Sequence, residues 1–276
     1  EDLDELLELS DRIAVFCNGE LTGVVEPAST DRYEIGRLAF ESPALLGGAA
    51  GRMGLSCGSC HLNGRSNANF FLEGVSDTPG RADVSLSLFS KVRGDKTFNP
   101  SPIPDVAAKD GKQIRDRLSP AFRTKVHGLV VEEFDGAEPS PVVFDALISF
   151  MNAQDVSECA DPSAMTAVSA AHDLADASLA FNEALTLHEM NEPAGALLMA
   201  RAARERLGVL DERFIAPDQA SLRNAIVAAS RAIEAWMTYE QENVGYCHVT
   251  CDPQHTAGNA MKQLDDLRAP VEKHAP

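Results

Sequence analysis

The sequence predicts a mainly α-helical protein, in which an N-terminal part with long loops precedes a C-terminal bundle of helices. Apolar residues recur every three or four positions in several early segments, and from Cys159 onward the chain is alanine-rich and keeps this helical spacing. Residues 62–113, by contrast, hold many Gly, Pro, Asn and Ser residues and little periodicity, which predicts loops. We therefore divide the chain into an N-terminal extension (1–30), a first domain (31–157) and a helical bundle domain (158–276).

Composition limits the classes of protein that the chain can represent. It has 276 residues, 24 basic against 42 acidic side chains, a net charge of −18 and 44% hydrophobic residues. The length fits one large or two ordinary domains, and the apolar share is sufficient for a packed core. So acidic a chain does not fit nucleic-acid binding or docking on an anionic membrane. No apolar run approaches the roughly 20 residues that a membrane span requires.

The N-terminal extension and the start of the first domain show short-range signals. Ile13–Phe16 and Leu21–Val25 flank the turn signal Asn18-Gly19, which predicts a β-hairpin. Residues 31–46 show helical spacing, and glycine-rich residues 47–54 follow them. We expect a hairpin, then a helix, then a loop.

Two further helices are expected in the first domain, over residues 112–127 and over Val142–Met151. Pro120 interrupts the apolar spacing of the first, whereas Pro141 suits the first turn of the second. Four helices are expected in the bundle, with these signals: Asp161-Pro162 at the start of the first, Pro193 and Gly208 at the two ends of the second, Asp218 at the start of the third, and Thr256 as the cap of the fourth.

The sharpest motif of the chain is Cys57-Gly58-Ser59-Cys60-His61. This C-x-x-C-H pattern is typical of covalent c-type haem attachment, in which each thiol adds to one vinyl group of the haem. The adjacent histidine can then bind the iron. The pattern predicts one haem c, with Cys57 and Cys60 as thioether anchors and His61 as the proximal iron ligand.

Two other functions are open to this cysteine pair. A thioredoxin-like redox pair should follow a strand and open a helix in a βαβ unit, and the sequence shows no such context. A zinc site needs a second pair of ligands, for which Cys247 and Cys251 are the candidates. We favour haem over both.

Haem attachment of this kind takes place outside the cytoplasm, and the chain starts without the features of a signal peptide. We therefore expect a mature periplasmic protein, in a compartment that permits disulfides. Cys17, Cys159, Cys247 and Cys251 can form two bridges in three pairings. The cluster Cys247, His248, Cys251 and His255 can also hold copper or zinc, but we favour disulfides.

A haem would also organise the long loop, because its apolar faces supply burial that the missing secondary structure does not. Candidates for the wall of its pocket are Phe70, Phe71, Leu86, Phe89 and Phe98. Each of them can equally be an ordinary core residue.

The segment that leads to the motif resembles a known family. IGRLAF at 35–40, PALL at 43–46 and GLSCGSCH at 54–61 are similar to a haem-binding segment of the bacterial di-haem cytochrome c peroxidases and their MauG-like relatives. The resemblance covers residues 31–155 and implies a cytochrome c-like haem domain with long loops. That family carries two C-x-x-C-H motifs, whereas this chain has one, so two-haem peroxidase chemistry does not carry over.

The second axial ligand decides what such a haem can do. His127 is the first candidate, since members of that family place a distal ligand in the corresponding region, and Met151 is the alternative. With two strong ligands the iron passes electrons, whereas an exchangeable sixth position permits peroxide activation.

We expect a periplasmic c-type cytochrome that transfers single electrons between redox partners. Its negative charge would favour a basic redox partner. Two other functions stay open: a single-haem peroxidase or oxidase of the cytochrome c peroxidase and MauG-like group, and a haem-anchored assembly module whose helical half binds a partner.

Overall fold

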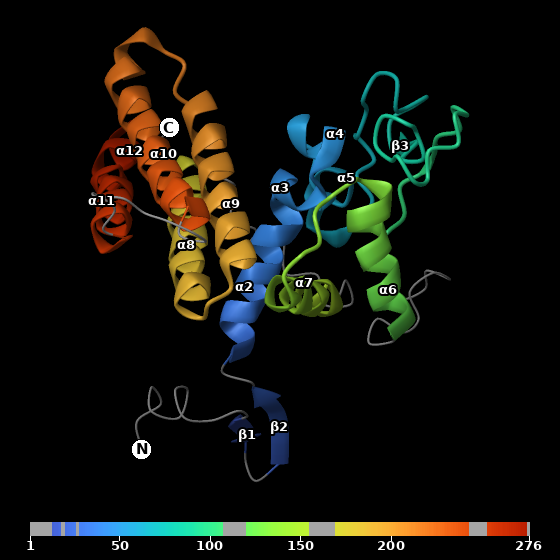
Figure 1. The fold of residues 1–276 in the computed structure, drawn as a ribbon, viewed down its shortest axis with the longest axis horizontal. Coiled ribbons are helices and arrows are strands. Elements are labelled where there is room, and N and C mark those ends of the chain that lie inside the picture. The colour runs from blue at the N-terminus through green and yellow to red at the C-terminus, as the bar shows by residue number, and fades with distance from the viewer. Residues whose placement is uncertain are drawn as a thin grey trace.

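The structure, a computed structural model, describes residues 13–17, 20–25, 28–106, 120–154, 169–242 and 253–274. Its described part is mainly helical, as predicted (Figure 1). No described helix is both long and apolar enough to cross a membrane.

The predicted hairpin is present at the N-terminal end. Strand β1 (Ile13–Cys17) pairs antiparallel with β2 (Glu20–Val25), and Ile13 lies opposite Val25. The hairpin extends beyond the start of the first long helix and away from the bundle (Figure 1).

The single helix expected over residues 31–46 is in fact two helices, α2 (Ala28–Glu41) and α3 (Pro43–Leu46), followed by α4 (Gly48–Arg52). Pro43 has no N–H group to continue the hydrogen-bond ladder of α2. Ser42 instead begins a new helix, because its Oγ accepts a hydrogen bond of 3.2 Å from the Ala44 N–H.

Helix α2 crosses α7 (Pro141–Ala153), which matches the helix expected over Val142–Met151. The crossing is close enough that a Cβ on Gly36 would lie 2.1 Å from the carbonyl oxygen of Ala146. Only glycine fits this position without moving one helix. Ser140 caps α7 through the Val143 N–H at 3.4 Å.

The motif lies between these two helices in the chain. It forms α5 (Cys57–Cys60), which continues into the 3₁₀ turn η1 (Leu62–Gly64). The predicted long loop follows over its described part and contains one short antiparallel pair, β3 (Arg81–Ala82) and β4 (Ser101–Pro102).

Helix α6 (Pro120–Gly128) continues into a π-helix, η2 (Leu129–Glu133). The helix expected over residues 112–127 is described from Pro120 onward, and residues 112–119 lie outside the described part of the chain. No signal in the sequence predicts the π-helix, whose wider turns are frequent at functional sites.

The bundle contains α8 (Ala170–Glu189), α9 (Pro193–Glu212), the 3₁₀ turn η4 (Pro217–Gln219), α10 (Ala220–Glu242), α11 (Pro253–Asp266) and α12 (Arg268–His274). The predicted end near Gly208 is wrong, because the buried Leu207 and Leu210 carry α9 past it. Thr256 lies inside α11 and does not cap it, α12 was not predicted, and Asp161-Pro162 lies outside the described residues.

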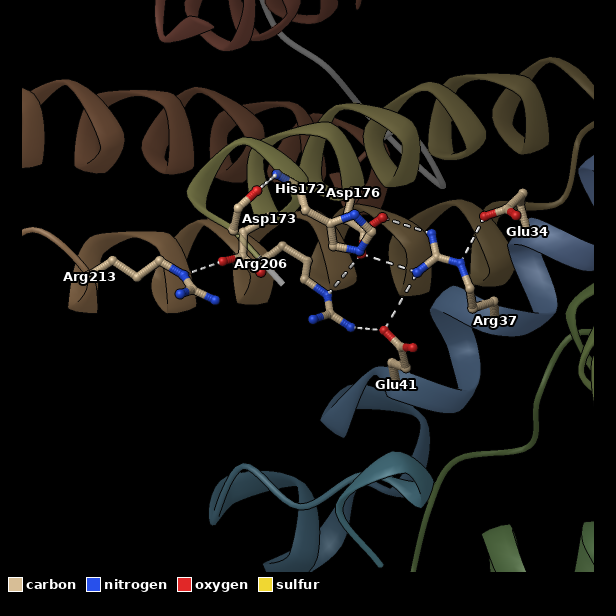
Figure 2. Close-up of polar contacts among 9 residues, drawn as sticks. Glu34, Arg37, Glu41, His172, Asp173, Asp176, Arg206 and Arg213 are labelled. Carbon is tan, nitrogen blue, oxygen red and sulfur yellow. Dashed lines mark hydrogen bonds and ion pairs between the residues drawn. The ribbon is translucent and has the colours of Figure 1, made fainter. Parts of the chain in front are cut away.

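One apolar core runs through both halves of the chain, from Ile35 on α2 to Val271 on α12. An ion-pair network borders it, in which Arg37 on α2 binds Asp176 on α8 with both terminal nitrogens, at 3.1 and 2.8 Å (Figure 2). Arg206 on α9 binds Glu41 on α2 in the same network. The bundle is therefore packed directly onto the helix that leads to the motif.

Candidate functional site

The cysteine motif is held in place by backbone hydrogen bonds and by one side chain. The His61 N–H donates to the Cys57 carbonyl at 2.8 Å, which closes the single turn of α5. Asn67 donates twice, from its N–H to the Cys60 carbonyl and from its side-chain amide to the Ser59 carbonyl, each at 2.9 Å. The first turn of the long loop therefore fixes the orientation of the motif.

Both thiols and the imidazole of the motif border one cavity of about 670 Å³, within the size range of cofactor pockets. Its walls come from four directions: α5, the loop from Phe70 to Ile103, the continuous α6–η2 segment, and the crossing helices α2 and α7. Most of the wall is apolar, and it includes Phe40, Leu46, Phe70, Val75, Phe89, Ile103, Phe122, Val126, Leu129, Val130, Phe134 and Leu147.

The structure places two of the five predicted wall residues in the cavity. Phe70 and Phe89 line it and are buried. Leu86 packs on the apolar cluster around the cavity without lining it. Phe71 and Phe98 are each 54% exposed and do not line it.

The sequence analysis missed the wall that α6 and η2 provide. Arg93 in the long loop holds this segment, because its guanidinium binds Glu132 and Glu133, each at 2.8 Å. Ser90 adds a 2.6 Å hydrogen bond to the Glu132 carbonyl. The signal for this wall in the sequence is the helical spacing of the apolar residues Phe122, Val126 and Leu129.

The two cysteines of the motif are free thiols that line the cavity. Burial, together with the charge of Cys60, raises the pKa of the Cys57 thiol to about 12. Burial alone raises the pKa of the Cys60 thiol to about 11. Both are therefore protonated at neutral pH, which does not fit a redox pair that needs a thiolate nucleophile.

His61 is the imidazole of the cavity. Burial lowers its pKa, while the Pro104 carbonyl and the charge of Asp105 act in the opposite direction. Its ring is therefore neutral at pH 7 and able to bind a metal. The buried Nδ1 has no hydrogen bond of good geometry, although the Pro104 carbonyl is close enough to raise the pKa. A metal-binding imidazole normally donates a hydrogen bond from its second ring nitrogen to such a carbonyl.

The two candidates for the second axial position lie in different surroundings. Met151, in the last part of α7, is a wall residue of the cavity. His127 on α6 is not among the wall residues, and its Nε2 lies 2.8 Å from a carboxylate oxygen of Glu138. The His127 ring also packs edge-on against Phe144, at 5.8 Å between ring centres. The structure thus brings Met151, and not His127, to the cavity of His61.

Protein side chains alone form no metal cluster in the described part of the chain. Of the cysteines outside the motif, Cys159, Cys247 and Cys251 lie outside the described residues, as does His248. The bridges predicted for these cysteines, and the metal site weighed against them, therefore stay predictions.

Two partly buried thiols, a neutral imidazole and apolar walls around one cavity fit a large, flat, apolar prosthetic group with a metal at its centre. Comparisons with family models, with curated proteins and with solved structures found no match.

Proposed function

We propose that the cavity holds one haem c, joined by thioether bonds to Cys57 and Cys60, and that the protein is a c-type cytochrome that transfers single electrons. One observation carries this proposal: both thiols and the imidazole of the C-x-x-C-H motif line the same apolar cavity. Neither the zinc nor the thioredoxin-like alternative needs such a cavity.

Each residue of the site would have its own role. Neutral His61 would bind the iron, and the Pro104 carbonyl would accept a hydrogen bond from the other ring nitrogen and orient the ring. The phenylalanines of the wall would cover the faces of the porphyrin and exclude water, and that burial influences the reduction potential. The bound group would supply a ferric/ferrous couple.

Met151 is the distal ligand that we propose, in place of His127. A thioether ligand would favour the ferrous state and raise the reduction potential. With His61 and Met151 both bound, the iron would keep no exchangeable position, which supports electron transfer over the peroxidase or oxidase alternative.

We further propose that the first half of the chain is related to the di-haem peroxidase and MauG-like group, that the protein is periplasmic, and that its redox partners include a basic protein. The support is the motif itself, which is matured outside the cytoplasm, and the net charge of −18. The rate of electron exchange with a basic cytochrome should fall as salt rises, and a rate independent of salt would exclude charge steering.

The attachment is tested by removing the cysteines from protein matured in the periplasm. Cys57→Ala and Cys60→Ala should each leave one thioether, which shifts the reduced pyridine haemochrome band to longer wavelength, and the double variant should retain no haem after acid–organic extraction. Cys17→Ala, outside the motif, is the matched control and should keep the wild-type band. Extractable haem in the wild-type protein would contradict the proposal.

A further inference from the structure

One side chain of the cavity wall has no role in the site as described so far. Lys125, on α6, carries the only positive charge among the described residues that line the cavity. Its side chain reaches solvent, so it lies at the mouth and not in the apolar interior.

Among the described residues Lys125 also lacks a counter-ion, in contrast with other cations around the site. Arg65 binds Asp105, and Arg123, two residues before Lys125, binds Asp145. Arg93 binds the two glutamates of η2. Lys125 forms no ion pair with any residue in the described part of the chain. A cation at the cavity that has no acidic partner in the described part of so acidic a chain points to a negative group that arrives with a ligand.

A haem is apolar over its faces but carries two carboxylates on one edge, and these must find water or a cation. The apolar wall offers them no partner, and the carboxylate of Asp105 would repel them. We propose that Lys125 pairs with a haem propionate at the mouth of the cavity. This inference rests on the proposed function. It means that the propionate edge of the haem faces α6.

The ion pair would have an electrostatic consequence for the iron. The ferric state carries one more positive charge than the ferrous state, so a nearby ammonium group disfavours it and raises the reduction potential. Lys125 is thus a positioning residue, which orients the ring and adjusts its potential without touching the iron.

The test uses haem-loaded protein and the variants Lys125→Gln, Lys125→Glu and Lys125→Arg. Lys91→Gln is the matched control, because Lys91 also lies in the haem half, does not line the cavity, and has its own partner Asp135 at 3.3 Å. Haem content by mass, the absorption spectrum, the midpoint potential and the propionate-bending bands in resonance Raman spectra are measured.

The pairing predicts a lower potential for Lys125→Gln, a still lower one for Lys125→Glu, and a value close to wild type for Lys125→Arg. The propionate bands should shift in Lys125→Gln, and the haem content and the spin state should not change. A potential in Lys125→Gln equal to that in Lys91→Gln would overturn the inference, as would a change of spin state, which would make the Lys125 nitrogen an iron ligand. Wild-type protein without haem would instead overturn the proposed function.

Discussion

Met151 and His127 differ in position more than in chemistry, since either side chain can bind iron. Met151 lines the cavity from α7, whereas His127 faces Glu138 on the outer side of α6. In the proposed haem-loaded protein, Met151→Ala should therefore convert low-spin iron to high-spin, observed as a new charge-transfer band and as carbon monoxide binding to the reduced protein. His127→Ala is the control and should keep the low-spin spectrum. The reverse result would restore His127 as the distal ligand.

The raised pKa values of the two thiols predict a pH dependence for the haem-free chain. In the unfolded chain the thiols ionise near pH 8.5, whereas in the fold they stay protonated to about pH 12 for Cys57 and about pH 11 for Cys60. The unfolded state therefore binds fewer protons across this window, and the free energy of unfolding should fall there by up to about 1.4 kcal/mol per pH unit for each thiol. Below pH 8 the effect should be absent.

Denaturant unfolding between pH 7 and 10.5 checks this, with the double variant Cys57→Ala, Cys60→Ala as the control. The control should lack the extra slope, because it has no thiols at the site. Equal slopes in both proteins would show that the thiols ionise as freely in the fold as in the unfolded chain.

At the scale of elements, the crossing of α2 and α7 depends on one glycine. Gly36→Ala would place a Cβ 2.1 Å from the Ala146 carbonyl oxygen, so the helices would have to move apart. We expect a loss of about 1–3 kcal/mol in unfolding free energy, as for other overpacked cores. Gly208→Ala is the matched control: its Cβ would meet nothing within 4 Å, and it should stabilise α9 by about 0.5–1 kcal/mol. A neutral Gly36→Ala would exclude a tight crossing.

The sequence predicted those elements whose local signals agree with their packing. Pro141 and the apolar stripe of α7 point to the same helix, and the turn signal at Asn18-Gly19 points to the hairpin that is observed. Predictions failed where packing overrode a local signal, as at Gly208, where buried neighbours outweigh the small cost of a glycine in a helix. That Cys57, Cys60 and His61 belong to one site could be predicted from their spacing, and the structure places all three at one cavity. The cavity wall could not, because it joins segments about 100 residues apart in the chain.

At the scale of the molecule, the ion-pair network joins the bundle to the half of the chain that carries the cysteine motif. The Asp176 side chain is only 5% exposed, so removing Arg37 leaves a buried carboxylate with weaker partners, His172 at 3.6 Å and Arg206 at 3.8 Å. Arg37→Met should cost about 3 kcal/mol in unfolding free energy, and the added change Asp176→Leu should recover most of it.

Lys262→Met is the control for that measurement. Lys262 is 72% exposed and pairs with Asp266 at 2.5 Å, so its removal should cost less than about 1 kcal/mol. A loss in Arg37→Met no greater than in Lys262→Met would show that the network does not hold the halves together.

The network also borders the motif, because a Cβ on Gly58 would lie 3.6 Å from Cγ of Glu41.

A covalent haem in the cavity is the central claim, and the intact mass of the wild-type protein tests it most directly. Protein matured in the periplasm and then denatured should be red and should have the mass of the polypeptide plus one haem. A colourless protein with the mass of the polypeptide alone would contradict the account.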